Sequence, residues 1–531
     1  MANKTLFQSP RGALSLTPAA NTTNAEGASA YALSPRHQLA QLAATGCLSQ
    51  TFYASAETEL AEVLALAAQV DAEFVAKTAV YARQAGHMKD MPSLLLATLA
   101  TRDVALMAQT FGAVIDSGKM LRNWVQVLRS GVTGRQSLGS RPKKLVQRWL
   151  LNASEAQLLH ASVGTTPSLA DVVKMVHPKP DEAWRAAWFA WLIGKPHDEA
   201  ALPPVTRAFE QYKRAALSGD AAAVAALPLP AVPFQMLTAL PLDSAQWARI
   251  AAQGSWQMVR QNLNTFARHG VFAQPGLAAQ IAGLLRDPQA VARAQVLPYQ
   301  LLAAYHHTEA GVPGEVREAL QDAMELALAQ VPTLSGQVVV CPDVSGSMGS
   351  AVTGHRQGAT STVRCIDVAA LVAAALVRRN PQTRVLPFEQ EVVSLALNPR
   401  DSVMTNAAKL AAIGGGGTNV SAPLALLNKE RAAVDLVVIV SDNESWIDHQ
   451  RHGATETQRQ WAALKARCPQ AKLVCIDIQP RTTTQVVDAA DVMNIGGFSD
   501  AVFGAMGRFV AGETGAAHWV AEIDKVVIAS Q

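Results

Sequence analysis

The stretch Gln337-Val-Val-Val-Cys341, followed by Pro342 and by Asp343-Val344-Ser345-Gly346-Ser347, decides the fold of the second half of the chain. Its first part is an apolar, β-branched run without polar alternation, which predicts a strand buried on both faces. Its second part places an acid and two serines directly after that strand. Open parallel sheets bind their ligands in loops at the carboxyl ends of the strands. The stretch therefore indicates an α/β fold with a functional loop at 343–347.

Strands and helices alternate from this stretch towards the end of the chain. The predicted strands are 337–341, 384–388, 435–440 and 472–478, and the predicted helices are 365–379, 421–431, 457–467 and 499–510. Such alternation is typical of a parallel sheet covered by helices on both faces. We therefore predict one doubly wound α/β domain at residues 337–531.

Residues 36–330 follow a different pattern. Apolar residues recur at three- and four-residue spacing in 57–86 and 91–117, with Gly or Pro between segments, which predicts amphipathic helices. Helix follows helix with almost no β-like run, as in an α-solenoid of packed helix pairs. The fold class is thus α plus α/β. Residues 1–35 are rich in Ser, Thr, Asn, Ala and Gly, and we predict a flexible N-terminal arm there.

Length and composition set the class of protein. The chain has 531 residues, too many for one core, and 49% hydrophobic with 16% charged residues is an ordinary globular balance. Its five cysteines form no CxxC pair and are odd in number, which argues against a disulfide framework or a zinc ribbon. The N-terminus lacks the pattern of a signal peptide and no apolar stretch is long enough to cross a membrane. We predict a cytoplasmic protein that has no membrane partner.

The net charge of +3 says little, but the distribution of basic residues says more. No acid lies between Asp116 and Glu155, and this block holds Lys119, Arg122, Arg129, Arg135, Arg141, Lys143, Lys144 and Arg148. Residues 129–135 are predicted to form a loop and 141–148 the start of a helix, with Pro142 in its first turn. A helix N-terminus with basic residues favours anions, so the block predicts a phosphate-binding face; a solvated charged face is the alternative. Trp124, Tyr81 and Trp149 are candidates to stack on bases or to pack between helices.

Three pieces of the α/β domain lie where such folds place metal ligands. They are Asp343, Ser345 and Ser347; Thr418, after the glycine run 414–417; and Asp442, after the strand 435–440. Together they resemble the metal-ion-dependent adhesion site of von Willebrand A-type domains. The resemblance implies a divalent cation, Mg²⁺ in the first place with Ca²⁺ or Mn²⁺ as alternatives, because hard cations prefer oxygen ligands. The alternative is a serine-rich turn. Glu444 lies beside the site. It is expected to be a solvated loop acid, with competition for the metal or tuning of the charge as the alternatives.

The order of several strings along the chain resembles that of the Ro autoantigen-like family, which joins a TROVE domain to an A domain. The strings are YARQAGHMKD (81–90), LRSGVTGRQSLG (128–139), KKLVQRWL (143–150), VKMVHPKP (173–180), LNTFARHGVF (263–272), VLPYQLLAAYHH (296–307), DVSGSM (343–348), GGGGTN (414–419) and VSDNES (440–445). The resemblance covers the chain from about residue 36 to its end and indicates a bacterial member.

The resemblance implies a ring of HEAT-like helical repeats at 36–330, with the A domain bridging its ends. Ro proteins hold small structured Y RNAs on a basic outer surface and admit single-stranded 3′ ends of defective RNAs into the central hole. Bacterial members can tether a 3′→5′ exoribonuclease, polynucleotide phosphorylase, through the Y RNA. The implied function is therefore RNA binding in RNA quality control.

Further residues are RNA candidates through this resemblance. His177 matches a family histidine implicated in Y RNA contact, and Lys174 and Lys179 lie beside it. Arg260 and Arg268 are candidates for the inner surface of the ring. The family's basic residues just upstream of the His177 helix have no counterpart in 160–168, which holds neither Lys nor Arg, so the Y RNA footprint is expected to differ.

Two other classes of function compete with RNA binding. The sequence has no Walker A lysine motif, no HExxH and no deaminase motif. His306 and His307 are adjacent in a predicted helix and do not share a face, so we predict that the protein is not an enzyme. A metal-dependent protein-binding adaptor without an RNA function is the second alternative. A pure adhesion module would not need the basic block.

Overall fold

The computed structural model describes residues 17–46, 48, 54–294, 296, 298–328, 331–352, 363–447, 453–479, 481–497, 499–513 and 518–528. The chain divides into two compact units. The A-domain unit comprises 1–70, 297–303 and 328–526, and the helical unit comprises 71–296, 304–327 and 527–531. Residues 1–16 of the predicted arm and Cys47 lie outside the described residues.

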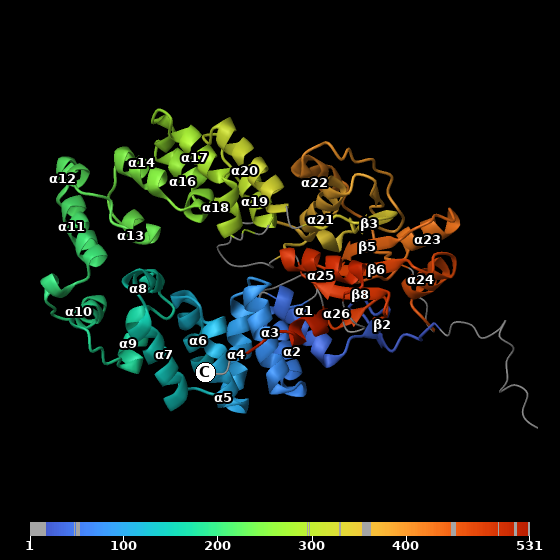
Figure 1. Cartoon of the computed structure of the whole chain (residues 1–531), viewed down its shortest axis with the longest axis horizontal. Coiled ribbons are helices and arrows are strands. Elements are labelled where there is room, and N and C mark those ends of the chain that lie inside the picture. The colour runs from blue at the N-terminus through green and yellow to red at the C-terminus, as the bar shows by residue number, and fades with distance from the viewer. Residues whose placement is uncertain are drawn as a thin grey trace, which may run out of the picture. The chain divides into compact units, whose positions relative to one another are not determined.

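A five-stranded parallel sheet forms the centre of the A-domain unit, in the order β4-β3-β5-β6-β8 (Figure 1). The strands are β3 Val338–Pro342, β4 Arg384–Val385, β5 Leu436–Ser441, β6 Lys472–Asp477 and β8 Val492–Gly496. Every residue of β3 and β5 is buried, because both faces of these central strands are covered. The predicted doubly wound α/β fold is confirmed, although β8 was not predicted.

Helices cover both faces of this sheet. They are α21 Cys365–Arg379, α22 Val403–Ala411, α23 Ala422–Lys429, α24 Glu456–Arg467, α25 Asp500–Ala511 and α26 His518–Asp524. Leu424 of α23 and Trp461 of α24 share one core with strand residues such as Ile439. The helices α21 and α25 contact strands as well but, among the described residues, contribute nothing to that core, which places them on the other face. The four predicted helices are present, and α22 and α26 are additions.

The N-terminal segment is built into the A-domain unit, which corrects the prediction of a flexible arm at 1–35 for its described part. β1 Thr22–Thr23 and β2 Ser29–Ala32 form a hairpin, and β2 pairs with β7 Thr483–Thr484. Asn24 and Tyr31 are buried. The small, polar composition of the segment is therefore that of a tight hairpin rather than of a loose tail.

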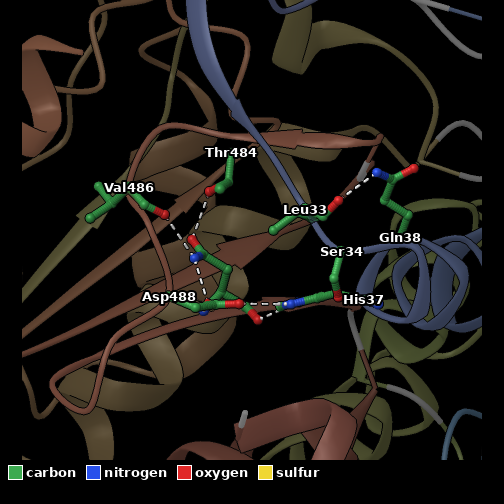
Figure 2. Close-up of polar contacts among 8 residues, drawn as sticks. Leu33, Ser34, His37, Gln38, Thr484, Val486 and Asp488 are labelled. Atoms are coloured by element: carbon green, nitrogen blue, oxygen red, sulfur yellow. Dashed lines mark hydrogen bonds and ion pairs between the residues drawn. The ribbon is translucent and has the colours of Figure 1, made fainter. Parts of the chain in front are cut away.

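The first two helices, α1 Pro35–Thr45 and α2 Ala56–Gln69, also belong to the A-domain unit. In α1, His37 bonds to the Asp488 carboxylate through Nδ1 (2.9 Å) and to the Asn494 carbonyl oxygen through Nε2 (3.0 Å). Figure 2 shows the His37 ring directed at Asp488. The predicted helical domain 36–330 is corrected accordingly, because the helical unit begins at Asp71.

The helical unit confirms the predicted array of helices (Figure 1). Its helices are α3 Ala72–Gln84, α4 Asp90–Arg102, α5 Val104–Val114, α6 Gly118–Ser130, α7 Ser140–Asn152, α8 Glu155–Ser162, α9 Leu169–Val176, α10 Ala183–Leu192, α11 Pro204–Ser218, α12 Ala221–Ala226, α13 Phe234–Thr238, α14 Ser244–Gln253, α15 Trp256–Gln261, α16 Leu263–Arg268, α17 Leu277–Leu285, α18 Pro288–Ala294 and α20 Gly314–Ala327; α19 Pro298–His306 is shared between the units. Helices near in sequence pack together, as α4 does on α3, α5 and α6. Side-chain caps such as Ser117 and Ser154 set where helices begin. Within the described ranges, no helix has the length and apolarity needed to span a membrane.

Candidate metal centre and nucleic-acid surface

The carboxyl ends of β3 and β5 bring the two predicted acidic ligands together. Pro342 and Val440 are partners in the parallel ladder, and Asp343 donates its N–H to the Val440 carbonyl oxygen (2.8 Å). Asp343 and Asp442 therefore emerge side by side from adjacent strands, at the edge where open α/β sheets bind ligands.

The predicted hydroxyl ligands converge on the same place. Thr418 donates its hydroxyl to Ser345 Oγ (3.0 Å), and Ser345 Oγ lies 3.4 Å from Ser347 Oγ. Backbone bonds hold the two loops against each other, from Gly346 N–H to the Gly416 carbonyl oxygen (3.1 Å) and from Gly415 N–H to that of Val344 (3.1 Å). Both Gly415 and Gly416 have positive φ, which explains a glycine run at this point.

The site is a buried concentration of carboxyl groups. Burial, and then the neighbouring Asp442, raise the pKa of Asp343 to about 7. Burial likewise raises the pKa of Asp442, against a hydrogen bond with Ser347 that lowers it. Removing a carboxylate from water disfavours its charged form, and a second carboxylate adds to the effect. Among the described residues that set the pKa values of Asp343 and Asp442, none supplies a positive charge that would balance the ionised pair.

This donor set fits a hard divalent cation. Asp343 and Asp442 supply negative charge, while Ser345, Ser347 and Thr418 supply neutral hydroxyl oxygens, the ligand types that Mg²⁺ and Ca²⁺ take. The Asp343 carboxylate is oriented by the Ser345 N–H (2.8 Å) and by the Ser441 hydroxyl (2.6 Å). Such outer partners orient metal ligands. Ser441 was not among the predicted site residues, since a serine ending a strand gives no distinctive signal.

Two acids near the pair are buried as well. Glu444 is 2% exposed, so the structure rules out a solvated loop acid; burial and Asp442 raise its pKa to about 7. Its Oε2 accepts the N–H of Ala25 in the N-terminal hairpin (2.7 Å). Asp477, at the end of β6, accepts from Asn443 Nδ2 (3.0 Å), and burial raises its pKa. Sequence reasoning missed Asp477 because its strand carries no motif.

The basic block lies on α6, on α7 and in the loop between them. The predicted loop is confirmed for residues 131–135, whereas Arg129 and Ser130 form the last turn of α6, which ends at Ser130. The predicted helix start at 141 is confirmed to within one residue, since α7 begins at Ser140. On α7, Arg141, Lys144 and Arg148 are exposed. Their spacing of three and four residues places them on one helix face. We call these three residues the α7 stripe.

The other predicted cations of the block divide into exposed and enclosed residues. Lys119 and Arg129 on α6 are exposed and Lys143 is half-buried. Lys119 lies near Lys89, whose pKa is lowered by burial and then by Lys119 and Arg83. Sequence reasoning missed Lys89, which stands outside the acid-free block.

Two predicted RNA contacts, Arg122 and Arg260, are corrected because they are buried, whereas Arg135 stays a prediction. Arg122 is 6% exposed, and its Nη1 donates to the Pro167 carbonyl oxygen (3.0 Å). Arg135 is half-buried and donates to the carbonyl oxygens of Ala100 (2.8 Å) and Leu138 (3.0 Å). Arg260 is buried, with its guanidinium 5.9 Å from the centre of the Trp256 ring. Arg122 and Arg135 brace the helical array, because a guanidinium taken out of water needs acceptors that backbone carbonyls supply.

Of the predicted stacking residues, Trp124 is fully buried and packs edge-on against Phe111. It is therefore a core residue, which settles the alternative in favour of packing. Tyr81 and Trp149 are half-buried. Arg268 is exposed, 3.9 Å from Glu309.

The residues around His177 line a hollow in the helical unit. His177 ends α9 in the left-handed conformation (φ 50°) and is exposed, as are Lys174 and Lys179. The hollow has a volume of about 470 Å³ and is lined by Val173, Lys174, His177, Pro178, Pro180, Ala186, Phe189, Ala190, Ile193 and Lys195. The side chains of Lys174 and Lys195 thus border an apolar surface inside the hollow. Lys195 was missed because it stands beyond the whole of α10 from His177 in sequence.

Comparisons with known proteins agree with this architecture. Residues 337–510 match the family model of the Ro60 von Willebrand A domain. The RNA-binding protein RO60 of Deinococcus radiodurans is 28% identical over 371 residues, which cover 65% of this chain and 66% of that protein, just under two thirds of its length.

The crystal structure of the Deinococcus radiodurans Ro (RSR) protein shares the fold with a TM-score of 0.63 and 21% identity, covering 91% of this chain and 100% of that one. Residues 337–510 thus form a Ro60-type von Willebrand A domain, and the chain as a whole is similar in fold to the bacterial Ro protein.

Proposed function

We propose that this chain binds RNA through the helical unit and that the A domain holds a divalent cation that receives an acidic group of a partner. The observation that carries the RNA proposal is the α7 stripe, three exposed cations on one helix face in a block without acids. Duplex RNA is held mainly through phosphates and 2′-hydroxyls, which such a stripe matches. The printed name of the Deinococcus relative, an RNA-binding protein, supports the same function.

The hollow beside His177 supports a second RNA contact. Single-stranded RNA binds where cations meet apolar or aromatic surfaces on which bases stack. Lys174 and Lys195 supply the cations, His177 supplies a polar ring, and Phe189 and Ile193 supply apolar surface. We assign the hollow to an unpaired segment of the RNA and the α7 stripe to its duplex.

The finer function follows the family resemblance. The RNA is a small structured Y-like RNA, single-stranded 3′ ends of defective RNAs enter a ring of helical repeats, and an exoribonuclease such as polynucleotide phosphorylase acts with the complex in RNA quality control. The protein binds and presents RNA and is not itself an enzyme, and it acts in the cytoplasm. A duplex with a 3′ overhang should bind more tightly than the same duplex with blunt ends; equal affinity would count against threading.

The proposed cation site rests on the buried carboxyl pair. Asp343, Asp442, Ser345, Ser347 and Thr418 hold the cation, which is Mg²⁺, with Ca²⁺ or Mn²⁺ as alternatives. When bound, the cation supplies positive charge and a coordination position that an acidic group can fill. A metal-dependent adaptor function is thereby a second activity of the chain, beside RNA binding.

The RNA proposal is tested by a triple variant of the α7 stripe, Arg141→Ala with Lys144→Ala and Arg148→Ala. We expect weaker binding across RNA sequences, because the stripe meets phosphates rather than bases. The salt dependence of binding should also become shallower, its slope falling by about 0.7–0.9 for each phosphate that the variant no longer neutralises.

The matched control removes three cations from α11 of the same unit, Arg207→Ala with Lys213→Ala and Arg214→Ala. Lys213 and Arg214 lie in ion pairs with Glu210 and Glu199. The control should keep the RNA affinity of the wild type. Equal decreases of affinity in the two triple variants would show a general effect of charge and remove the α7 stripe from the site.

A further inference from the structure

Two large apolar side chains stand exposed next to the proposed cation site. Trp446 is 45% exposed and Ile447 is 37% exposed. They follow Asp442 by four and five residues, in the loop after β5. Adjacent exposed apolar residues beside a ligand site are typical of an interaction surface. The fold and the proposed cation site leave these two side chains without a function.

The backbone of this loop is fixed from both sides. The N–H groups of Trp446 and Ile447 both donate to the carbonyl oxygen of Thr418, at 3.1 Å and 3.3 Å. On the other side, Asn24 Nδ2 donates to the Ser445 carbonyl oxygen (2.7 Å). The backbone of the two apolar residues is therefore bonded directly to Thr418, a proposed cation ligand, so that their side chains are held beside the cation site.

Gly417, the last glycine of the run 414–417, leaves the space in which the side chains of Trp446 and Ile447 pack. A Cβ placed on Gly417 would lie 2.5 Å from Ile447 Cδ1 and 2.6 Å from Trp446 Cζ2. Both side chains thus lie directly over the backbone that leads into Thr418. Gly417 has no positive φ, so its identity here reflects close packing rather than backbone conformation.

We propose that Trp446 and Ile447 form an apolar ledge that, together with the cation site, binds a protein segment in which an acidic residue is flanked by a large apolar residue. The carboxylate fills the open position of the cation, and the apolar neighbour packs on the ledge. This inference rests on the proposed cation site and names the class of partner for it. Trp is among the side chains most often found at the energetic centre of protein interfaces.

The charge around the ledge favours a protein segment over RNA. Glu26, in the exposed turn of the N-terminal hairpin, is near enough to Asp442 and Glu444 to act on both carboxyl groups. RNA would bring one phosphate to the cation and further phosphates to this acidic rim, where nucleic acid sites need cations instead. A protein segment brings a single carboxylate, and its other residues can be neutral or basic.

Binding is tested with a random dodecapeptide library displayed on phage and selected on the full chain in Mg²⁺, with a parallel selection in EDTA. We expect peptides enriched only in Mg²⁺ to share an acidic residue next to Trp, Phe, Leu or Ile. Trp446→Ala should weaken the binding of a selected synthetic peptide by about tenfold or more. The matched control is Leu217→Ala, which removes an apolar side chain that is 64% exposed on α11 and should leave the affinity unchanged.

A second measurement separates failure of the ledge from failure of the cation site. In protein labelled with 5-fluorotryptophan, the Trp446 resonance is identified by its disappearance in Trp446→Phe, and Mn²⁺ should broaden it in the wild type but not in Asp343→Ala. No broadening overturns the cation site itself. Broadening with no Mg²⁺-dependent peptides, or with full peptide affinity in Trp446→Ala, overturns the ledge. Trp446-dependent binding of a single-stranded oligonucleotide in place of peptides overturns the protein partner.

Discussion

The two units of this chain bury charge in opposite ways. In the helical unit the buried charges are arginines, such as Arg122 and Arg185, whose guanidinium groups donate to backbone carbonyl oxygens. In the A-domain unit they are carboxyl groups, such as Asp343 and Asp442, whose pKa values are raised by burial. A buried guanidinium that has its acceptors is part of the scaffold, whereas two neighbouring buried carboxyl groups with raised pKa values indicate a binding site.

The comparison also bears on the proposed RNA binding. Because the buried arginines of the helical unit are engaged in holding helices together, we expect RNA to be bound by exposed cations such as those of the α7 stripe. Exposed cations keep their charge and remain accessible to phosphate. In the helical unit, the residues that hold the helices together are therefore not the residues proposed to contact RNA. At the proposed cation site, the same buried residues have both roles.

The largest effect is expected from Arg122→Ala. Removing this guanidinium leaves the Pro167 and Val163 carbonyl oxygens without the donors that now reach them. We expect the free energy of unfolding to fall by about 3 kcal/mol, measured by denaturant unfolding, with the RNA affinity of the folded protein unchanged. Arg141→Ala is the counterpart, with a stability change within about 0.5 kcal/mol and weaker RNA binding. A stable Arg122→Ala protein with weaker RNA binding would break the distinction between scaffold and contact.

A smaller effect is expected from pH in the A-domain unit. The pKa of Asp343 rises from 3.8 to about 7 on folding. The contribution of Asp343 to the free energy of unfolding is therefore fully present below about pH 4 and is lost as the pH rises through 7. In EDTA we expect the wild type to lose on the order of 2 kcal/mol more than Asp343→Asn between pH 5 and pH 8.

Mg²⁺ should reverse this trend, because it binds the ionised carboxylates and so stabilises the protein more at pH 8 than at pH 5. Thermal unfolding of both proteins, with EDTA or with Mg²⁺, measures the two slopes. If the stability of the wild type and of Asp343→Asn changes equally with pH in EDTA, the pKa of Asp343 is not raised by folding.

The smallest effect concerns the place of α1 within the A-domain unit. His37→Ala removes the bonds of α1 to Asp488 and Asn494. We expect about 1–2 kcal/mol less protection of the α1 amides in hydrogen exchange. Gln38→Ala is the control on the same helix, because Gln38 Nε2 bonds only locally in Figure 2, to the Leu33 carbonyl oxygen. An equal decrease of protection in both variants would argue that α1 is held by its own helix propensity and not by the A domain.

Much of the A domain was predictable from sequence, and the reason is local. Strands 337–341 and 435–440 are uninterrupted apolar runs, and each is followed at once by a predicted ligand. Once the sheet is parallel, topology alone brings Asp343 and Asp442 together. Ser441 and Asp477 escaped notice because their importance depends on which strands are neighbours, and sequence shows no such neighbours.

The basic block shows the limit of sequence reasoning about surfaces. Arg122 and Arg141 look alike in an acid-free run, yet one is buried and the other exposed. The difference lies in helix phase, since Arg122 shares a face of α6 with the buried residues Gly118, four positions before it, and Val125, three positions after it. The N-terminal arm was misjudged for a related reason, because β7, the partner strand of its β2, comes from the far end of the sequence.

The central claim is that the RNA surface and the cation site are separate, and Asp343→Ala tests it most directly. Calorimetry with Mg²⁺ and RNA binding by gel shift are compared between this variant and the wild type, with circular dichroism as the check of folding. We predict no heat of Mg²⁺ binding and an unchanged RNA affinity. Loss of both in a variant that is still folded would mean that the cation organises the RNA surface, and would contradict the division between the two units.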